Sequence, residues 1–183
     1  METRLWAHPS CSSAAVDGEI VATIERLSAG TLRFRYLLAG RIDQLVLPPP
    51  APPLRANNLW RTTCFEAFLA PADGPDYREL NFSPSSQWAA YEFSAYRAGR
   101  VDAWLPAPPE IKLTSQKDCL ELTVTLSLDL EREPYRLGLS AVIEDRGGRI
   151  SYWAVSHPGG GSPPDFHHRS CFALELPPAE ATP

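Results

Sequence analysis

Hydrophobic and polar residues alternate along much of this chain, and helical periodicity is scarce. In the segment TLRFRYLL, the side chains of Leu32, Phe34 and Tyr36 alternate with those of Arg33 and Arg35. The segment CLELTVTLSLDL places leucine and valine on one side and Glu, Thr and Ser on the other. Alternation of this kind is typical of a β-strand with one face on a core and the other in water. Both segments are therefore predicted to be strands of an antiparallel sheet.

Similar runs elsewhere are expected to form further strands. They cover residues 19–27, 44–47, 59–69, 77–82, 87–95, 111–114, 135–144, 150–157 and 171–176. Segments rich in Gly, Pro, Asn and Asp, such as ADGPD and EDRGGR, separate the runs and predict turns. About ten short strands with frequent turns and no long helix predict an all-β fold, a two-sheet antiparallel β-sandwich.

Composition and charge narrow the class of protein. A chain of 183 residues, 44% hydrophobic and 21% charged, has enough apolar material for one core. We expect a single domain over residues 1–176 and a frayed C-terminal tail over residues 177–183. The net charge of -5 and the lack of a basic run argue against nucleic acid as a partner. Without a signal-peptide pattern or a membrane-spanning apolar run, we expect a soluble, cytoplasmic protein with no membrane partner.

The four cysteines give no sign of a metal site. Cys11, Cys64, Cys119 and Cys171 lie far apart in the sequence and form no C-x-x-C pair. Free thiols are expected in a cytosolic protein, and a bridge between Cys11 and Cys171 is the alternative.

The segment LWRTTCFEAFLAP carries a carboxylate within an apolar strand. Alternation puts Trp60 and Glu66 on the same face of that strand. Because a lone buried carboxylate is costly, Glu66 is expected to be paired, hydrogen-bonded or exposed in a wet groove. An ion pair with Arg33, Arg35 or Arg61 and a role in ligand binding are the two alternatives.

The segment YRELNFSPSSQWAAYEF has the pattern of a hairpin. Glu79 and Asn81 share one face of its first strand, and Trp88 follows the turn. Carboxylate and amide groups beside an indole can hold sugar hydroxyls while the sugar ring stacks on the aromatic face. In the alternative interpretation Trp88 belongs to the core and Glu92 is solvated.

The segment SYWAVSHPGGGSPPDFHHRSCFALEL joins a strand to a loop rich in Gly and Pro. Trp153 and His157 share one side of the strand, and Asp165, His167 and His168 follow in the loop. Loops at the ends of a sandwich often carry binding groups. Histidine and aspartate ligate zinc, but the spacing matches neither H-E-x-x-H nor H-x-H, so the metal is left unknown. Anchoring of the loop by these histidines is the alternative.

Catalytic motifs are absent from the sequence. It has no G-x-S-x-G elbow, no phosphate-binding P-loop and no dinucleotide-type glycine pattern. Glu66 and Glu79 could act as a glycosidase pair, and the sequence does not define their separation.

Taken in order, LWRTTCFEAFLAP, YRELNFSPSSQWAAYEF and YWAVSHPGGGSPPDFHHRSCFALEL resemble the bacterial DOMON-like proteins, which are related to family 9 carbohydrate-binding modules. The resemblance covers residues 60–176. It implies an immunoglobulin-like or jelly-roll sandwich with a groove, where tryptophans hold a sugar and acidic, amide and basic side chains bind its hydroxyls. In the strand after Trp60, Thr62 and Thr63 replace an expected Asp, which puts a calcium site there in doubt.

Other DOMON relatives bind haem through Met and His ligands. The only methionine of this chain is Met1, which speaks against that arrangement. Ligation by two histidines, His157 with His167 or His168, is the remaining haem alternative. We therefore expect no cofactor, with haem or a metal ion as the alternative.

The leading hypothesis is a non-catalytic module that holds a small ligand, preferably a carbohydrate or sugar derivative, in an aromatic and acidic groove. The expected binding residues are Trp60, Glu66, Glu79, Asn81, Trp88, Trp153, His157 and His167. The three tryptophans are expected to be at least partly exposed in one groove. One alternative is a metal-dependent or carboxylate-based enzyme that uses Glu66 and the loop 157–168. Another is a structural module that forms a homodimer.

Overall fold

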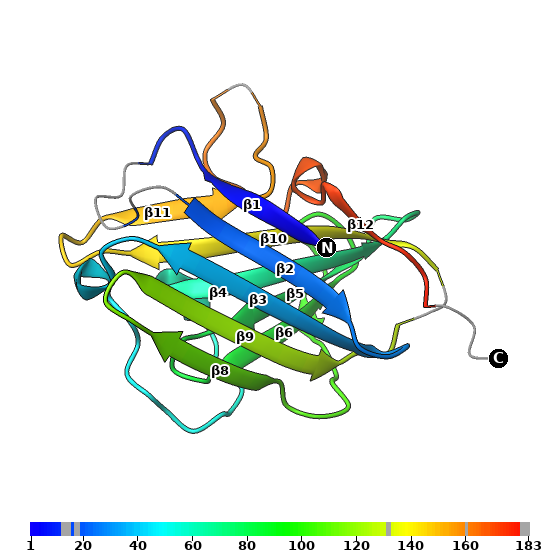
Figure 1. Cartoon of the computed structure of the whole chain (residues 1–183). Helices are drawn as coiled ribbons and strands as arrows, with labels where there is room; N and C mark the ends of the chain where they lie inside the picture. The colour runs from blue at the N-terminus through cyan, green and yellow to red at the C-terminus, as the bar shows by residue number, and fades with distance from the viewer. Residues whose placement is uncertain (12–15, 17–18, 131–132, 160, 180–183) are drawn as a thin grey trace.

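The computed structural model describes residues 1–11, 16, 19–130, 133–159 and 161–179. Over these residues the chain forms twelve β-strands and three short 3-10 helices. All strand pairs are antiparallel, and the sheet curls so that its two halves face each other as the layers of a sandwich (Figure 1). The predicted all-β sandwich is confirmed.

The front layer in Figure 1 has the strand order β1-β2-β3-β9-β8. Its strands are β1 (Glu2–Ala7), β2 (Glu19–Arg26), β3 (Thr31–Ala39), β9 (Cys119–Ser127) and β8 (Glu110–Ser115). The two segments with the clearest alternation, at β3 and β9, pair with each other over their whole lengths. Their apolar side chains point to the interior, as predicted.

The back layer has the order β11-β10-β4-β5-β6-β7, and β12 also pairs with β10. Its strands are β4 (Cys64–Pro71), β5 (Tyr77–Phe82), β6 (Trp88–Phe93), β7 (Val101–Asp102), β10 (Tyr135–Glu144), β11 (Ile150–Ala154) and β12 (Leu174–Leu176). Strand β1 joins the two layers, because its first part pairs with β2 and its end pairs with β11.

The main core lies between the layers. Phe34 and Tyr36 from the front layer contact Phe82 and Phe65 from the back layer, with ring centroids 5.9 Å and 5.1 Å apart. The hydroxyl of Tyr36 donates a 2.7 Å hydrogen bond to the backbone oxygen of Glu66. This bond satisfies a buried hydroxyl and also ties the layers together.

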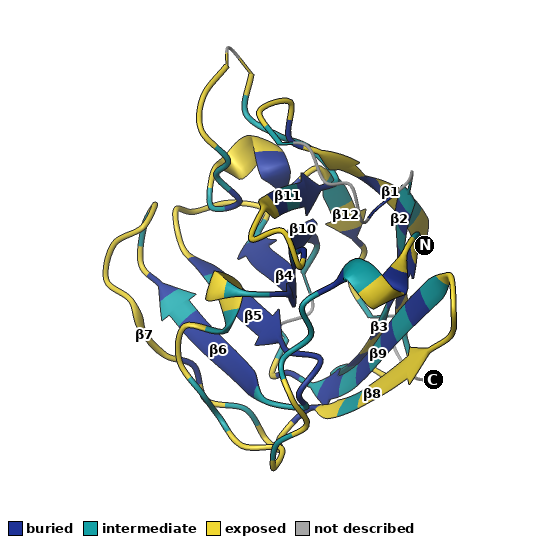
Figure 2. Ribbon diagram, turned by 90° about the vertical axis from the view of Figure 1, so that its left-hand side faces the viewer, coloured by how far each residue is buried: buried dark blue, intermediate teal, exposed yellow. Residues whose placement is uncertain are grey.

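The two layers differ in how their outer faces are covered. Strands β2, β3 and β9 alternate between buried residues and intermediate or exposed ones, whereas β4 and β5 are buried on almost every residue (Figure 2). The difference arises because the segment between β11 and β12 lies against the outer face of the back layer. There Phe172 stacks on Phe68 at 5.7 Å, in a second apolar cluster separate from the main core.

Several predicted strand boundaries are wrong. Residues 44–47 are not a strand, because Ile42–Gln44 is a 3-10 helix and only Leu45 forms an isolated bridge. Residues 59–61 also form a 3-10 helix, which follows Asn58 in the left-handed conformation. The strand after it therefore begins at Cys64.

Other segments are also shorter than predicted, and two strands were missed. Residues 150–157 stop pairing after Ala154, and in residues 171–176 only Leu174–Leu176 is extended, since Cys171 ends a third 3-10 helix. Strands β1 and β7 were not predicted. Within β1 only Leu5 is buried, and β7 has only two residues, so neither shows a clear alternation.

The four cysteines are free, so the alternative of a Cys11–Cys171 bridge is wrong. Of the expected C-terminal tail, residues 180–183 lie outside the described residues, and the guanidinium of Arg26 binds the backbone oxygen of Pro177. Among the described residues there is no helix of the length and apolar character needed to cross a membrane. The division into one domain and a tail stays a prediction.

Candidate functional site

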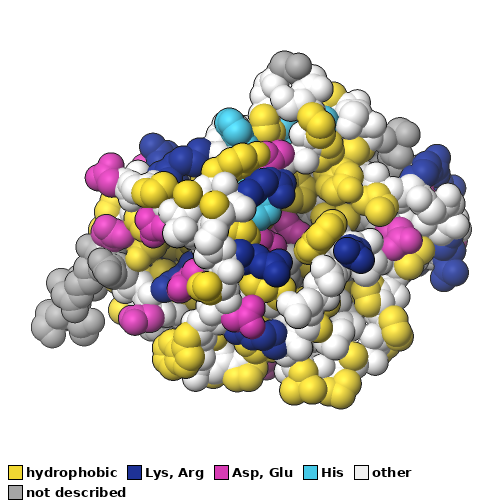
Figure 3. Space-filling view, turned by 180° about the vertical axis from the view of Figure 1, so that it is seen from behind, with side chains coloured by type: hydrophobic (Ala, Val, Ile, Leu, Met, Phe, Trp, Pro, Cys, Tyr) yellow, Lys and Arg dark blue, Asp and Glu magenta, His cyan; other side chains and the backbone are white. Residues whose placement is uncertain are grey.

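A pocket of about 610 Å³ lies on the outer face of the back layer, between β4, β5, β6 and the segment that precedes β12. It is called the outer pocket. Its lining residues are Trp60, Glu66, Phe68, Glu79, Tyr91, Phe93, Arg97, Arg100, Val142, Tyr152, Pro163, Pro164, Phe166 and His167. Acidic, basic, histidine and hydrophobic side chains meet on this face of the molecule (Figure 3). Its volume is within the usual range of small-molecule sites, about 300–1,000 Å³.

Strand register brings two carboxyl groups to the floor of the outer pocket. Glu66 on β4 pairs with Asn81 on β5, and Phe68 pairs with Glu79, so the two glutamates are diagonal neighbours on one face. The side-chain nitrogen of Asn81 donates a 2.7 Å hydrogen bond to Glu79. Asn81 itself is buried and does not line the pocket, but its hydrogen bond holds one of the carboxylates in place.

Glu66 has no basic partner among the described residues. The proposed ion pairs with Arg33, Arg35 and Arg61 are not found: Arg33 pairs with Glu25, Arg35 pairs with Glu121, and Arg61 lies over the ring of Trp60. That alternative for Glu66 is wrong, because β3 carries both Arg33 and Arg35 on the outer face of the other layer.

The electrostatic environment favours a neutral Glu66. Burial raises the pKa of Glu66 well above its usual value, and the nearby charge of Glu79 raises it further, while a 3.3 Å hydrogen bond from Ser140 lowers it. Burial also raises the pKa of Glu79, but the bond from Asn81 and the charges of Arg100 and Arg97 oppose the shift. Glu79 is therefore the better placed of the two to carry a negative charge.

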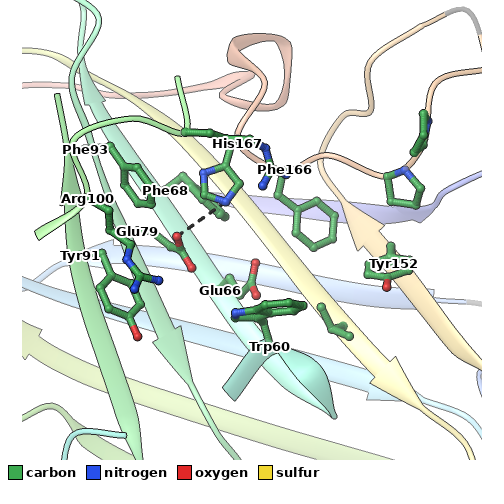
Figure 4. A pocket seen from close by; sticks show the side chains of 14 residues that line it. Trp60, Glu66, Phe68, Glu79, Tyr91, Phe93, Arg100, Tyr152, Phe166 and His167 are labelled. Carbon is green, nitrogen blue, oxygen red and sulfur yellow. Dashed lines mark ion pairs between the residues drawn. The ribbon is translucent and has the colours of Figure 1, made fainter. Parts of the chain in front are cut away.

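His167 lies next to the carboxylate of Glu79, and a dashed line joins the two in Figure 4. Its Nε2 lies 3.7 Å from Glu79, and its Nδ1 lies 2.7 Å from the hydroxyl of Tyr77. Burial and the charge of Arg97 lower the pKa of His167 to about 4. Because the Tyr77 hydroxyl accepts the backbone N–H of Arg97, its own hydrogen is available to Nδ1, which favours a neutral imidazole with its hydrogen on Nε2.

Aromatic side chains form the walls. Trp60 is 45% exposed and its indole extends along one edge of the pocket, below Glu66 in Figure 4. Tyr91 and Phe166 stand on other sides of the cavity. The hydroxyl of Tyr91 donates a 2.8 Å hydrogen bond to Asn57, which fixes its ring. A partly exposed indole beside polar groups is suited to stack on an amphipathic ring.

Two arginines supply hydrogen-bond donors. Arg100 lies 4.8 Å from the ring centroid of Tyr91 and forms no ion pair with the part of the chain that the structure describes. Arg97 is bound to Asp165 at 2.8 Å. The outer pocket therefore combines carboxyl acceptors, guanidinium donors and apolar ring faces, a set that can hold a polyhydroxylated molecule.

The structure brings together some of the expected binding residues and separates others. Trp60, Glu66, Glu79 and His167 line the outer pocket, and Asn81 is hydrogen-bonded to Glu79. The expectation that all three tryptophans are partly exposed in one groove is wrong. Trp88 and Trp153 are 7% and 6% exposed and belong to the core between the layers.

His157 also lies outside the lining of the outer pocket. Its Nε2 is 2.7 Å from the backbone oxygen of Trp6, and its ring meets the edge of His8 at 4.9 Å. It therefore anchors the loop, as one of the two interpretations proposed. Among the described residues no group of three or more His, Cys, Asp or Glu side chains is arranged to hold a metal ion.

Several lining residues escaped the sequence interpretation. Arg97 and Arg100 lie in the segment RAGR, whose glycine indicated only a turn. Tyr91 on β6 and Tyr152 on β11 were not among the expected binding residues. No sequence pattern distinguishes these residues from others on an outer face of a sheet. They lie close together only because the fold brings distant strands and a loop to the same place.

The comparisons with known proteins concern the fold. No family model matches the sequence, and no curated protein matches it either. A solved structure from Bacteroides uniformis ATCC 8492, described as a candidate carbohydrate-binding protein, is similar with a TM-score of 0.61 and 12% identity, over 93% of this chain and 83% of that chain. A family 9 carbohydrate-binding module from Caldicellulosiruptor kristjanssonii, solved with glucose, is similar with a TM-score of 0.50 and 11% identity, over 82% of this chain and 72% of that chain. At these identities the likeness establishes a shared β-sandwich fold.

Proposed function

We propose that this protein is a carbohydrate-binding module that holds a sugar ring in the outer pocket against the indole of Trp60. The observation that carries the proposal is this exposed indole at the edge of a cavity whose floor has two carboxyl groups. Sugar C–H faces stack on aromatic rings, while hydroxyls bind carboxylates, amides and guanidinium groups. The names of both similar structures refer to carbohydrate binding, which is in keeping with the proposal.

The charges of the pocket favour an uncharged sugar. Glu66 and His167 are held towards their neutral forms, Arg97 is neutralised by Asp165, and Arg100 offsets the charge of Glu79. No strong net charge is then left to attract an ionic ligand. A neutral polyol can use the donors and acceptors without leaving a buried charge unpaired. We further propose that the chain is a member of the bacterial DOMON-like proteins.

A sugar screen by thermal shift and isothermal titration calorimetry tests this function. Glucose, galactose, mannose, xylose and N-acetylglucosamine are suitable probes, each also as its linear oligomers. A bound sugar raises the melting temperature through mass action. Trp60→Ala is expected to weaken binding about tenfold or more, as loss of an aromatic contact typically does.

Trp104→Ala is the matched control, because Trp104 is 71% exposed and does not line the outer pocket. It is expected to bind like the unmodified protein. If none of the sugars raises the melting temperature, or if Trp60→Ala binds as tightly as the unmodified protein, the proposed function is wrong.

The pair of glutamates favours a second candidate function, a carboxylate-based glycosidase. A neutral acid beside a charged carboxylate is the arrangement that glycoside hydrolysis uses. Release of nitrophenol from nitrophenyl glycosides would support it, provided that Glu66→Gln and Glu79→Gln both abolish release. Recovery of every sugar unchanged after long incubation would favour the binding module.

Two further expectations stay proposals with their own tests. We propose a homodimer as an alternative assembly, and light scattering that gives the mass of one 20.2 kDa chain at high concentration would contradict it. We propose a cytoplasmic location, which fractionation of the source cells would test.

A further inference from the structure

A second cavity adjoins the outer pocket. It is called the side cavity, and its lining includes Tyr96, Arg97, Pro163, Pro164, Asp165 and His168. Arg97, Pro163 and Pro164 line both cavities, so one shared wall separates them. The side cavity has a volume of about 610 Å³, equal to that of the outer pocket. The two cavities are therefore neighbours that meet at these three residues.

Tyr96 provides an aromatic face in the side cavity. Tyr96 is one of the exposed large hydrophobic residues, with 55% of its surface accessible. Its hydroxyl donates a short hydrogen bond to one oxygen of Asp165, and the other oxygen of Asp165 accepts from Arg97 at 2.8 Å. The ring of His168 approaches it edge-on, with centroids 6.5 Å apart. These contacts hold the ring in one orientation, with the guanidinium of Arg97 over it at 6.0 Å from the centroid, and they leave the residue partly exposed.

The backbone near Tyr96 is also held in one conformation. A tight turn brings Ala98 back to Ala95, with a 3.0 Å bond between their backbones. Gly99 has a φ of +66°, and a Cβ there would lie 2.0 Å from the side-chain oxygen of Ser94. Glycine is therefore required at this position of the turn. A rigid aromatic ring loses little freedom when a ligand stacks on it.

Asp165 connects this turn with the outer pocket. Besides Tyr96 and Arg97, it accepts the backbone N–H of His167 at 3.1 Å. Its carboxylate thus fixes the aromatic face of the side cavity and the histidine of the outer pocket at the same time. Arg97, on the shared wall, offers donors to groups on both sides.

We propose that the side cavity is a second subsite, and that the ligand is a linear oligosaccharide with one unit against Trp60 and the next against Tyr96. This inference rests on the proposed function, since it extends the same site. Arg97 lies where the two units join and binds hydroxyls of either one. The preferred ligand has at least two sugar units, and a single sugar fills only the outer pocket.

Titration calorimetry with matched sugars tests the second subsite. The probes are the monosaccharides of the screen and their linear dimers and trimers. We expect a dimer or trimer to bind about tenfold tighter than its monosaccharide, the usual effect of one added aromatic contact. In Tyr96→Ala, the ratio of oligomer to monosaccharide affinity is expected to fall towards one. Tyr96→Phe keeps the ring but loses the bond to Asp165, so its ratio is expected to be intermediate.

Trp104→Ala serves again as the control and is expected to keep the full ratio. As a second measurement, the amide NMR signals of Arg97 and Gly99 are expected to shift more with the dimer than with the monosaccharide. Equal affinity for monosaccharide and oligomers, or a full ratio in Tyr96→Ala, overturns the second subsite and leaves the proposed function standing. Failure of every sugar to bind overturns both.

Discussion

The hydroxyl of Tyr77 on β5 lies 2.7 Å from Nδ1 of His167 in the segment before β12. This contact connects the sheet with the segment that covers its outer face. It also leaves Nε2 of His167 directed at Glu79, 3.7 Å away. The histidine is largely buried and shares its surroundings with Arg97, so the neutral imidazole is favoured.

His167 is expected to make stability depend on pH. Its pKa is about 4 in the folded chain, against an ordinary value of 6.5. As pH falls from 6.5 to 4, the unfolded chain binds a proton at this histidine that the folded chain does not bind. His167 therefore lowers the free energy of unfolding, on the order of 2–3 kcal/mol near pH 4. His167→Gln removes this contribution. The free energy of unfolding, from urea denaturation at several pH values, is then expected to fall less steeply with decreasing pH.

His168→Gln is the control, since His168 is exposed. It is expected to keep the steeper pH dependence of the unmodified protein. Parallel curves for the unmodified protein and His167→Gln would contradict the prediction.

Glu66→Gln is expected to stabilise the protein at neutral pH. The pKa of Glu66 is raised in the folded state, so its contribution to stability is present below the ordinary carboxyl pKa and is lost as pH rises. Glutamine resembles the protonated acid and can still accept the hydrogen bond from Ser140. The gain in unfolding free energy is roughly 1–3 kcal/mol at pH 7 and close to zero at pH 4. Chemical denaturation at the two pH values measures it.

Glu175→Gln, on an exposed position of β12, is the matched control and is expected to change stability little. A loss of stability in Glu66→Gln at pH 7 would mean that the ionised carboxylate is favoured by the fold.

The tryptophans are expected to separate into two classes. Trp153 is buried between the layers, and its indole N–H donates a 3.0 Å hydrogen bond to Ser151. Trp153→Ala is expected to lower the unfolding free energy by about 3–5 kcal/mol. Trp60→Ala, at an exposed position, is expected to change it by no more than about 0.5 kcal/mol. Comparable losses in both variants would contradict this assignment of core and pocket.

Gly138 on β10 is expected to tolerate no side chain. A Cβ there would lie 2.9 Å from the ring of Phe172 and 3.0 Å from the backbone oxygen of Cys171. Gly138→Ala therefore pushes the covering segment away from the sheet and is expected to cost roughly 1–3 kcal/mol. Gly159→Ala, where a Cβ meets nothing within 4 Å, is the control for the same substitution. Thermal denaturation of the two variants gives the comparison, and equal melting temperatures would contradict the prediction.

Much of the fold is readable from local sequence. The alternation predicts Tyr77–Phe82 and Tyr135–Glu144 with their observed bounds, and it orients β3 and β9 correctly. Boundaries fail where one residue leaves the extended conformation, as Asn58 does before the 3-10 helix at Leu59–Arg61. The local hydrophobic pattern has no information on that backbone angle.

Alternation along each strand was enough to place Glu66 on one face of β4 and to set Glu79 and Asn81 together on β5. Only the tertiary structure decided that these faces meet and that a distant segment covers them. It also moved Trp88 and Trp153 into the core and brought Arg97, Arg100 and Phe166 to the outer pocket. The reason is physical: a side chain's face follows from its own strand, but its neighbours depend on register between strands far apart in the chain.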